Sequence, residues 1–236
     1  MSIAENIAAI RAEITEAAIA AGRNPKDILL CAATKMNDAS NVRQAIAAGV
    51  DCCGENRVQE LVQKLSESAY DGAPVHFIGH LQTNKVRQVV GKVSLIQSVD
   101  SLRLLEAIQK EAARQGIIQD ILLEINIGNE KNKTGFSLDE IWQILPLVSQ
   151  MPNVCVTGLM AIPPICQEPT ENRKFFQEMF NLSVDITAKK YDNISVRILS
   201  MGMSGDYQEA IACGSTMIRI GTAIFGARNY LNSHHN

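Results

Sequence analysis

The chain has 236 residues, of which 46% are hydrophobic and 20% are charged, a composition typical of soluble globular proteins. Its formal net charge of −3 gives no basic footprint for nucleic acid. No apolar run reaches the roughly 18 residues that span a bilayer, and the amino terminus lacks the basic and apolar regions of a signal peptide. These features argue against nucleic-acid-binding and membrane-spanning classes and predict a cytoplasmic protein.

Helical and strand patterns alternate along the chain from its first residues. Ile3, Ile7, Ile10 and Ile14 recur at helical spacing and predict a helix over 2–21, ending near Gly22. Short apolar runs predict eight strands, at 27–35, 50–54, 74–79, 93–99, 120–127, 154–160, 195–200 and 216–220. Further helices are predicted between the strands, at 40–48 (with Ser40 as its cap), 56–68, 84–90, 101–115, 137–149, 170–189 and 204–212.

Eight short strands that alternate with helices are the repeat of a (β/α)8 TIM barrel rather than of an open sheet with one switch point. The length suits such a barrel, which needs about 250 residues. No linker or change of composition divides the chain. We therefore expect one domain, with an amino-terminal helix at 2–21, a barrel at about 27–228 and a polar tail at 229–236.

Lys35 ends the first apolar strand run. A continuous apolar run is typical of a strand buried on both faces of a parallel sheet. Burial favours the neutral amine, which is the nucleophile that forms a Schiff base with a carbonyl. The alternative is a lysine that extends to solvent from the rim of the sheet.

Two loops that contain glycine and hydroxyl side chains follow the seventh and eighth predicted strands. They read Ser200-Met-Gly-Met-Ser204 and Gly221-Thr-Ala-Ile-Phe-Gly226. In (β/α)8 barrels these loops frequently build a phosphate site, because backbone N–H groups at the start of a helix suit an anion. Ordinary strand-to-helix turns have a similar composition, so that alternative stays open for each loop by itself.

Arg219 lies within the eighth predicted strand, and residues two apart in a strand share a face. If Ile218 and Ile220 face the helices, Arg219 points into the barrel. A buried arginine needs an acceptor, since it does not lose its charge. Glu124 and Asn126 should also face inward, so the acceptor is either a ligand atom or an internal salt bridge with Glu124.

The chain has six cysteines and four histidines. None of the cysteines forms a Cys-x-x-Cys pair, and most lie in apolar runs, so we expect buried thiols in a reducing compartment, without disulfides or zinc. Two of the histidines, His234 and His235, fall in the polar tail. The sequence therefore gives little basis for a metal site.

A lysine amine, an anion cradle and an arginine at one barrel mouth match what pyridoxal 5'-phosphate (PLP) requires, namely an amine partner, a phosphate site and a group opposite the pyridine nitrogen. The choice of arginine has a chemical consequence. A permanent cation beside the ring nitrogen disfavours its protonation, so the ring becomes a weaker electron sink.

Several specific runs, spread along the whole chain, carry a resemblance to a known family. They are Ala33-Thr-Lys35, Gly54-Glu-Asn-Arg57, His76-Phe-Ile-Gly-His-Leu-Gln-Thr-Asn-Lys85, Gly158-Leu-Met160, Leu199-Ser-Met-Gly-Met-Ser-Gly-Asp206 and Ile218-Arg-Ile-Gly-Thr222. With these runs the sequence resembles the pyridoxal phosphate homeostasis proteins, the YggS/PROSC family. The resemblance implies a barrel like the amino-terminal domain of alanine racemase (PLP fold type III), without the second domain of those enzymes.

The same resemblance implies site residues. Lys35 would hold PLP covalently as an internal aldimine, and Arg219 would face the pyridine nitrogen. The other implied cofactor contacts are Asn56, His80, Met160, Ser200, Ser204, Gly221 and Thr222. No catalytic residue is assigned.

Three functions remain open from the sequence. The first is a PLP carrier that takes part in homeostasis of intracellular PLP (vitamin B6) and of amino and keto acids. The second is a small PLP-dependent enzyme such as an amino-acid racemase, and the third is a cofactor-free Schiff-base barrel of aldolase type. Racemisation in this fold needs a second base from another domain, and the sequence ends at Asn236, soon after the eighth strand. His80 or Tyr207 could replace that base or serve only as wall residues.

Partner expectations follow the carrier function. We expect PLP as the ligand, apo PLP-enzymes as recipients of the cofactor, and a monomer, because the racemase dimer contact involves the second domain.

Overall fold

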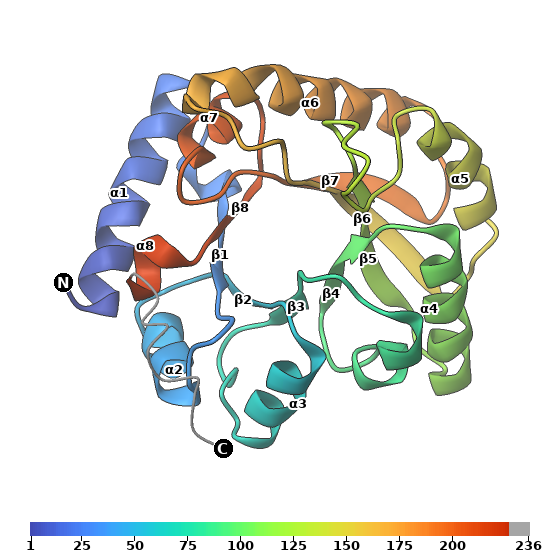
Figure 1. Ribbon diagram of the computed structural model, residues 1–236, viewed down its shortest axis with the longest axis horizontal. Helices are drawn as coiled ribbons and strands as arrows, with labels where there is room; N and C mark the ends of the chain where they lie inside the picture. Colours follow the sequence, from blue (N-terminus) through green and yellow to red (C-terminus); the bar gives the residue numbers. More distant parts are fainter. Residues whose placement is uncertain (227–236) are drawn as a thin grey trace.

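A computed structural model describes residues 1–226; the predicted tail at 229–236 and the last two residues of the predicted barrel lie outside the described residues. Eight parallel strands close into a barrel in chain order, β1 to β8 (Figure 1). The strands are β1 (Leu29–Ala33), β2 (Cys52–Glu55), β3 (Val75–Phe77), β4 (Leu95–Val99), β5 (Gln119–Ile125), β6 (Val154–Ala161), β7 (Ile194–Ser200) and β8 (Met217–Ile220). The predicted (β/α)8 fold is confirmed.

Helices surround the strands, as Figure 1 shows. They are α1 (Ile3–Ala20), α2 (Ala39–Ala47), α3 (Val58–Ser66), α4 (Leu102–Gln115), α5 (Glu140–Val148), α6 (Arg173–Ala188), α7 (Tyr207–Ala212) and α8 (Thr222–Phe225). Short 3₁₀ segments are η1 (Pro25–Asp27), η2 (Thr83–Gln88) and η3 (Pro169–Asn172). No helix within residues 1–226 combines the length and apolar character needed to cross a bilayer.

Two local predictions were wrong. The segment after β3 is the 3₁₀ helix η2 rather than an α-helix over 84–90, because it is too short to gain many α-helical bonds before Gly91 turns the chain at a φ of 76°. The cap of α2 is Asp38 instead of Ser40. The Asp38 carboxylate accepts a 2.8 Å hydrogen bond from the Asn41 N–H, and the helix begins one residue before Ser40.

The alternation of side chains in the strands divides the interior into two layers. Outward residues such as Leu30, Ala32 and Ile220 join the large core between strands and helices. Inward residues form two small clusters inside the barrel itself, Cys31 with Cys52 and Met217, and Leu95 with Leu122 and Met160. Since both faces of each strand are covered, the barrel interior is packed.

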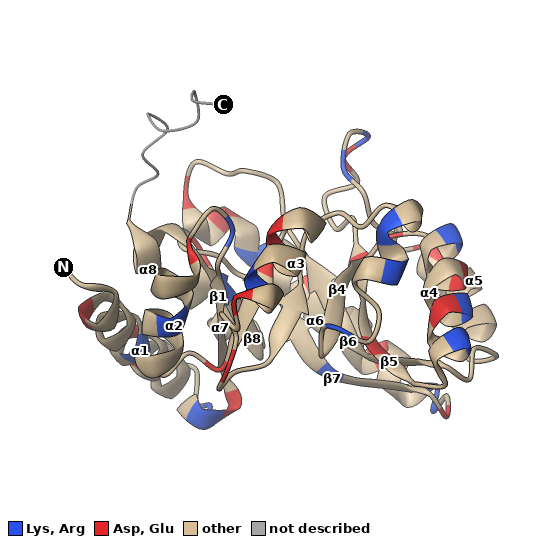
Figure 2. Ribbon diagram, turned by 90° about the horizontal axis from the view of Figure 1, so that it is seen from below, with Lys and Arg blue, Asp and Glu red and all other residues tan. Residues whose placement is uncertain are grey.

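Helix α1 lies across the seam where the barrel closes, beside α7 and α8 (Figure 1). Its buried face is made of Ile7, Ile10, Ile14 and Ala18. The Asn6 side chain donates a 2.8 Å hydrogen bond to the carbonyl of Ile224 in α8. Acidic and basic residues are interspersed over the outer helices (Figure 2). The first helix therefore braces the junction of the first and last strands.

Gly158 is a point of close backbone approach between β6 and β7. A Cβ atom at this position would lie 1.8 Å from the carbonyl oxygen of Ile198, which is backbone and cannot rotate away. We expect Gly158→Ala to lower the free energy of unfolding by about 1–3 kcal/mol or more, through overpacking. Chemical denaturation measures this change. Gly205→Ala is the matched control, since a Cβ there meets nothing within 4 Å, and equal stability of the two variants would contradict the prediction.

Candidate functional site

The closing seam of the barrel brings Lys35 to the loop after β8. Strands β1 and β8 pair with Cys31 opposite Arg219. A Cβ atom on Gly221 would lie 3.4 Å from the Cβ of Ala33, so Gly221 and Ala33 are neighbours across the seam. Lys35 is half-buried and follows Ala33 by two residues at the carboxyl end of the barrel. The first and last parts of the chain thus meet at one mouth.

The loop after β7 runs beside the strand that leads to Gly221. The Arg219 N–H donates a 3.0 Å hydrogen bond to the carbonyl of Gly202, whose φ of 95° favours glycine. Ser200 is fully buried, Gly221 is half-buried and Thr222 is exposed. Ser204 is exposed and lines a pocket of about 260 Å³ on the α1 side of the loop. The two predicted loops are therefore adjacent. Ser204 differs from the other residues of these loops because it borders the pocket beside α1.

Arg219 points into the barrel, as the alternation of strand residues predicted. Its side chain donates hydrogen bonds to Ser200 Oγ (2.6 Å) and to the carbonyl of Ala161 (3.0 Å), and the residue is 5% exposed. Burial lowers the pKa of the guanidinium, while the nearby Cys31 and Glu124 oppose that shift. Within the described chain no ion pair joins Arg219 to Glu124, so the predicted alternative of an internal salt bridge is not formed.

Glu124 in β5 and Asn126, which directly follows β5, have separate roles. The Glu124 carboxylate accepts a 3.2 Å hydrogen bond from Thr134, and burial raises its pKa, with a further contribution from the negative charge of Asp100. Asn126 instead organises the following loop. Its amide donates to the carbonyl of Glu130 at 2.9 Å and accepts from the Glu130 N–H at 3.1 Å.

Asn56, His80 and Met160 are among the cofactor contacts that the resemblance implied. Asn56 directly follows β2, and its buried Oδ1 atom has no hydrogen-bond partner. A Cβ on Gly79 would lie 2.1 Å from the Asn56 carbonyl oxygen, so only glycine permits this packing. His80 is exposed, with Nδ1 2.9 Å from a carboxylate oxygen of Asp100, whereas Met160 is buried inside the barrel. The orphaned Asn56 oxygen is the feature that best suits a ligand contact.

A buried ion pair holds the backbone just before Lys35, and sequence analysis missed it. Lys64 Nζ lies 2.5 Å from Glu55 Oε1 and donates a 2.8 Å hydrogen bond to the carbonyl of Thr34. The Thr34 hydroxyl donates to the same Glu55 oxygen at 2.5 Å. One sequence signal was available, because Lys64 follows Leu61 at helical spacing on the buried face of α3. Removing Lys64 would leave the Glu55 carboxylate buried without its ion-pair partner, whereas removing Glu55 would leave Lys64 with Glu60, whose carboxylate oxygen lies 3.6 Å from Nζ.

A polar chain runs from Arg219 toward the amino-terminal end of the barrel. Ser200 Oγ donates to Gln97 Oε1 at 2.7 Å, and Gln97 Nε2 lies 2.9 Å from His76 Nδ1. Beyond it are the thiols of Cys31 and Cys52. A hydrogen bond from Cys52 lowers the pKa of Cys31, and His76 adds to this effect. Sequence analysis expected buried thiols, and it did not foresee that two of them adjoin a histidine.

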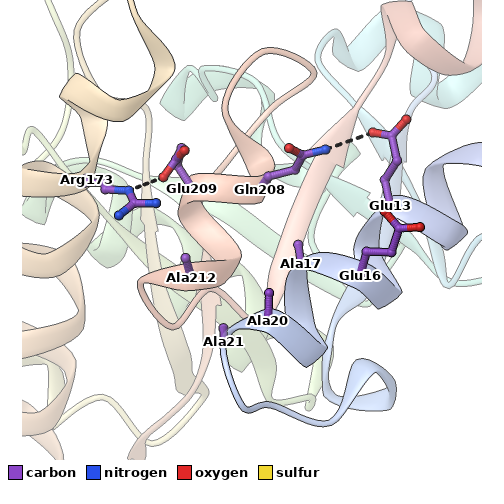
Figure 3. A pocket seen from close by; sticks show the side chains of 9 residues that line it. All are labelled: Glu13, Glu16, Ala17, Ala20, Ala21, Arg173, Gln208, Glu209 and Ala212. Carbon is purple, nitrogen blue, oxygen red and sulfur yellow. Dashed lines mark hydrogen bonds and ion pairs between the residues drawn. The ribbon is translucent and has the colours of Figure 1, made fainter.

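Tyr207, one of the two possible replacements for a second base, points away from the barrel mouth. Its hydroxyl donates to the carboxylate of Glu13 in α1, and both burial and this contact raise its pKa. The neighbouring Gln208 also donates to Glu13, at 3.1 Å, beside a groove of about 510 Å³ between α1 and α7 (Figure 3). On the opposite wall Arg173 pairs with Glu209 (Figure 3). Tyr207 therefore stabilises helix packing.

The protein is a closed parallel barrel that carries Lys35 after its first strand and a glycine-containing loop after its last strand. The family model described as "Alanine racemase, N-terminal domain" matches residues 3–229. A relative from Aquifex aeolicus (strain VF5), named pyridoxal phosphate homeostasis protein, is 38% identical over 230 residues, which is 98% of this chain and 100% of the relative.

Solved structures show the same similarity to PLP-binding barrels. PipY of Synechococcus elongatus PCC7942, with PLP bound, is 32% identical with a TM-score of 0.82, and the match covers 95% of this chain and 100% of PipY. Alanine racemase of Clostridium difficile 630 shares the fold, at 14% identity and a TM-score of 0.73 over 95% of this chain and 57% of the racemase. The chain belongs to the family of pyridoxal phosphate homeostasis proteins, and the resemblance seen in the sequence is confirmed.

The raised pKa of Glu124 predicts a pH-dependent effect on stability. Burial raises the pKa of Glu124 in the folded protein above its value in the unfolded chain. Below the unfolded pKa the carboxyl is neutral in both states, so it does not reduce stability. As the pH rises through the folded pKa, the buried group becomes charged and the folded protein loses stability. We expect Glu124→Gln to leave stability unchanged at pH values below the unfolded pKa and to increase it progressively toward neutral pH. Denaturant unfolding across this pH range measures the difference, and a stabilisation confined to acid would contradict the prediction.

Proposed function

We propose that this protein binds PLP through Lys35 and takes part in homeostasis of intracellular PLP and of amino and keto acids, without catalysing a reaction of its own. The main support is the β1–β8 seam, which brings the Lys35 segment beside Gly221 and places Arg219 directly below it. The names of the Aquifex relative and of the PLP-bound PipY structure support the same ligand.

The residues at the mouth fit this cofactor. A phosphorylated pyridine aldehyde needs an amine, an anion site and polar contacts to the ring. Lys35 supplies the amine, and the open backbone at Gly221 with the exposed hydroxyl of Thr222 suits a phosphate. The buried and unpaired Oδ1 of Asn56 offers a hydrogen-bond acceptor to the ligand.

When bound, the cofactor supplies an aldehyde that condenses with a primary amine and a ring that accepts electrons. The chain's own residues decide how far that chemistry can go. Arg219 is held by Ser200 and Ala161 and keeps its proton, so it would leave the pyridine nitrogen unprotonated. Ser200, Gly221 and Thr222 would hold the phosphate, with Ser204 as a further contact, while Asn56, His80 and Met160 would line the ring. This arrangement retains the cofactor without strengthening it as an electron sink.

Two observations favour a carrier over an enzyme. Tyr207 is committed to α1, and the His80 ring is 2.9 Å from Asp100 at an exposed position. The proposal includes apo PLP-enzymes as recipients of the cofactor and a monomeric state. It also includes a cytoplasmic location, because six free cysteines are typical of a reducing compartment.

Covalent trapping tests the role of Lys35. We expect borohydride reduction of the PLP-loaded protein to add the mass of one reduced cofactor to the Lys35 peptide, because only a carbonyl–amine linkage is reduced in this way. Lys35→Ala should lose the adduct and the absorbance of the linkage. The matched control is Lys85→Ala, half-buried in η2, which should keep both. An adduct on another lysine would refute the assignment, and colourless protein without an adduct would favour the aldolase-type alternative.

Solvent exchange tests the absence of catalysis. Because Tyr207 is held by Glu13 and His80 lies exposed beside Asp100, the loaded protein should exchange the α-proton of alanine in deuterated water no faster than free PLP at equal concentration. Mass spectrometry of the amino acid after a single turnover gives the rate. Faster exchange that disappears in Lys35→Ala or His80→Ala would identify a PLP-dependent enzyme, with His80 as its base in the second case.

A further inference from the structure

The barrel interior below Arg219 contains three side chains whose metal-binding atoms converge. Cys31 and Cys52 occupy directly paired positions on β1 and β2, and His76 lies on the next strand, β3. The two sulfur atoms and one imidazole nitrogen all lie within 4.8 Å of one another, and all three residues are buried. Three hydrogen-bonded strands fix the backbone at these positions, so the cluster exists before any ligand arrives.

We propose that Cys31, Cys52 and His76 form a binding site for one thiophilic d¹⁰ cation, Zn²⁺ or Cu⁺. Two thiolates and an imidazole are a soft set of the kind that selects these ions, and the same set holds zinc with three protein ligands and one open position. Zinc bonds of about 2.3 Å to sulfur and 2.0–2.1 Å to nitrogen place the ligand atoms about 3.5–3.8 Å apart. The observed spread needs a closure of only about 1 Å, which side-chain rotation can supply.

Two neighbours complete the surroundings of this cluster. Met217 belongs to the same interior group as the two cysteines and offers a thioether as a fourth, weaker ligand. Gln97 Nε2 lies 2.9 Å from His76 Nδ1, which leaves Nε2 for the cation. On binding, Nδ1 carries the ring proton, and a flip of the Gln97 amide turns its oxygen toward that proton. The flip releases Met217 Sδ, to which Gln97 Nε2 donates at 3.1 Å, and replaces the hydrogen bond from Ser200 Oγ to Gln97 by one from Gln97 Nε2 to Ser200 Oγ. Gln97 therefore acts as a positioning residue for the imidazole.

The cluster has its own access route, away from Lys35. A cavity of about 410 Å³ opens among residues at the amino-terminal end of the barrel, and both His76 and Met217 line it. Asp120 and Arg197 both lie on its wall, so the access route carries one acidic and one basic side chain. The proposed site therefore lies on the opposite side of Arg219 from the cofactor mouth, and its test does not depend on PLP binding.

Metal titration of the full-length chain tests the proposal. We expect one equivalent of Zn²⁺ to bind in reducing buffer, and Co²⁺ to give sulfur-to-cobalt charge-transfer absorption that reports thiolate ligation. Cys31→Ser and Cys52→Ser should each weaken Zn²⁺ binding by more than about 100-fold, and Gln97→Leu by about 10–100-fold. Competition between Zn²⁺ and chelator-buffered Cu⁺ decides which ion the site prefers.

Matched controls separate this site from other thiols and imidazoles. Cys155→Ser removes a half-buried thiol outside the cluster. A double change of His234 and His235 to Ala removes two adjacent histidines near the end of the sequence. Both should bind Zn²⁺ like the unaltered chain. Thermal unfolding verifies that each variant folds, and His76→Gln replaces any serine variant that does not. Binding that persists in the serine variants, binding lost with the tail histidines, or a Cys31–Cys52 disulfide in place of metal uptake would overturn the proposal.

Discussion

The closure of the sheet between β1 and β8 is the constraint on which the rest of this molecule depends. Lys35 and Gly221 are far apart in the sequence and become neighbours only because eight parallel strands return to the first. Parallel pairing fixes both strands in direction, so their carboxyl ends meet on the same side. Helix α1 covers this seam through its buried isoleucines and the hydrogen bond from Asn6 to α8. The site is thus assembled by topology rather than by a local motif.

Buried charge is the second organising feature of the barrel. Arg219, Lys64 and Glu55 are all nearly inaccessible, and each is held by short hydrogen bonds. Desolvating such groups is unfavourable unless every polar atom finds a partner. The Lys64–Glu55 pair meets that condition only at Glu55 Oε1, because the buried Glu55 Oε2 has no hydrogen-bond partner among the described residues. Lys64 also donates a hydrogen bond to the carbonyl of Thr34. It therefore fixes the backbone from which Lys35 extends.

The interior also connects the two ends of the barrel. Arg219, Ser200, Gln97 and His76 form a continuous chain of hydrogen bonds from the region beneath the mouth to the thiols of β1 and β2. The position of a proton or the orientation of an amide at one of these residues restricts the hydrogen bonds that its neighbours can form, because each group has a limited set of donors and acceptors. A cation at the cysteine–histidine cluster and a cofactor at the mouth would meet through this chain. The proposed cofactor site and the proposed metal site are therefore connected through hydrogen bonds, although each can be tested alone.

The sequence by itself determined the (β/α)8 fold, the family and the inward direction of Arg219. The fold and the direction of Arg219 follow from local periodicity, since residues two apart in a strand share a face and helical runs repeat at their own spacing. The sequence indicated the family through specific runs such as Ala33-Thr-Lys35 and Ile218-Arg-Ile-Gly-Thr222. It predicted the cap of α2 and the segment after β3 incorrectly, because Asp38 and Ser40 are both good caps and a few residues decide between α and 3₁₀ geometry. Only the tertiary structure decided which inward residues touch. The absence of an Arg219–Glu124 ion pair, the burial of Lys64 against Glu55 and the meeting of Cys31 and Cys52 with His76 depend on strand register and barrel closure, which link residues that no local pattern relates.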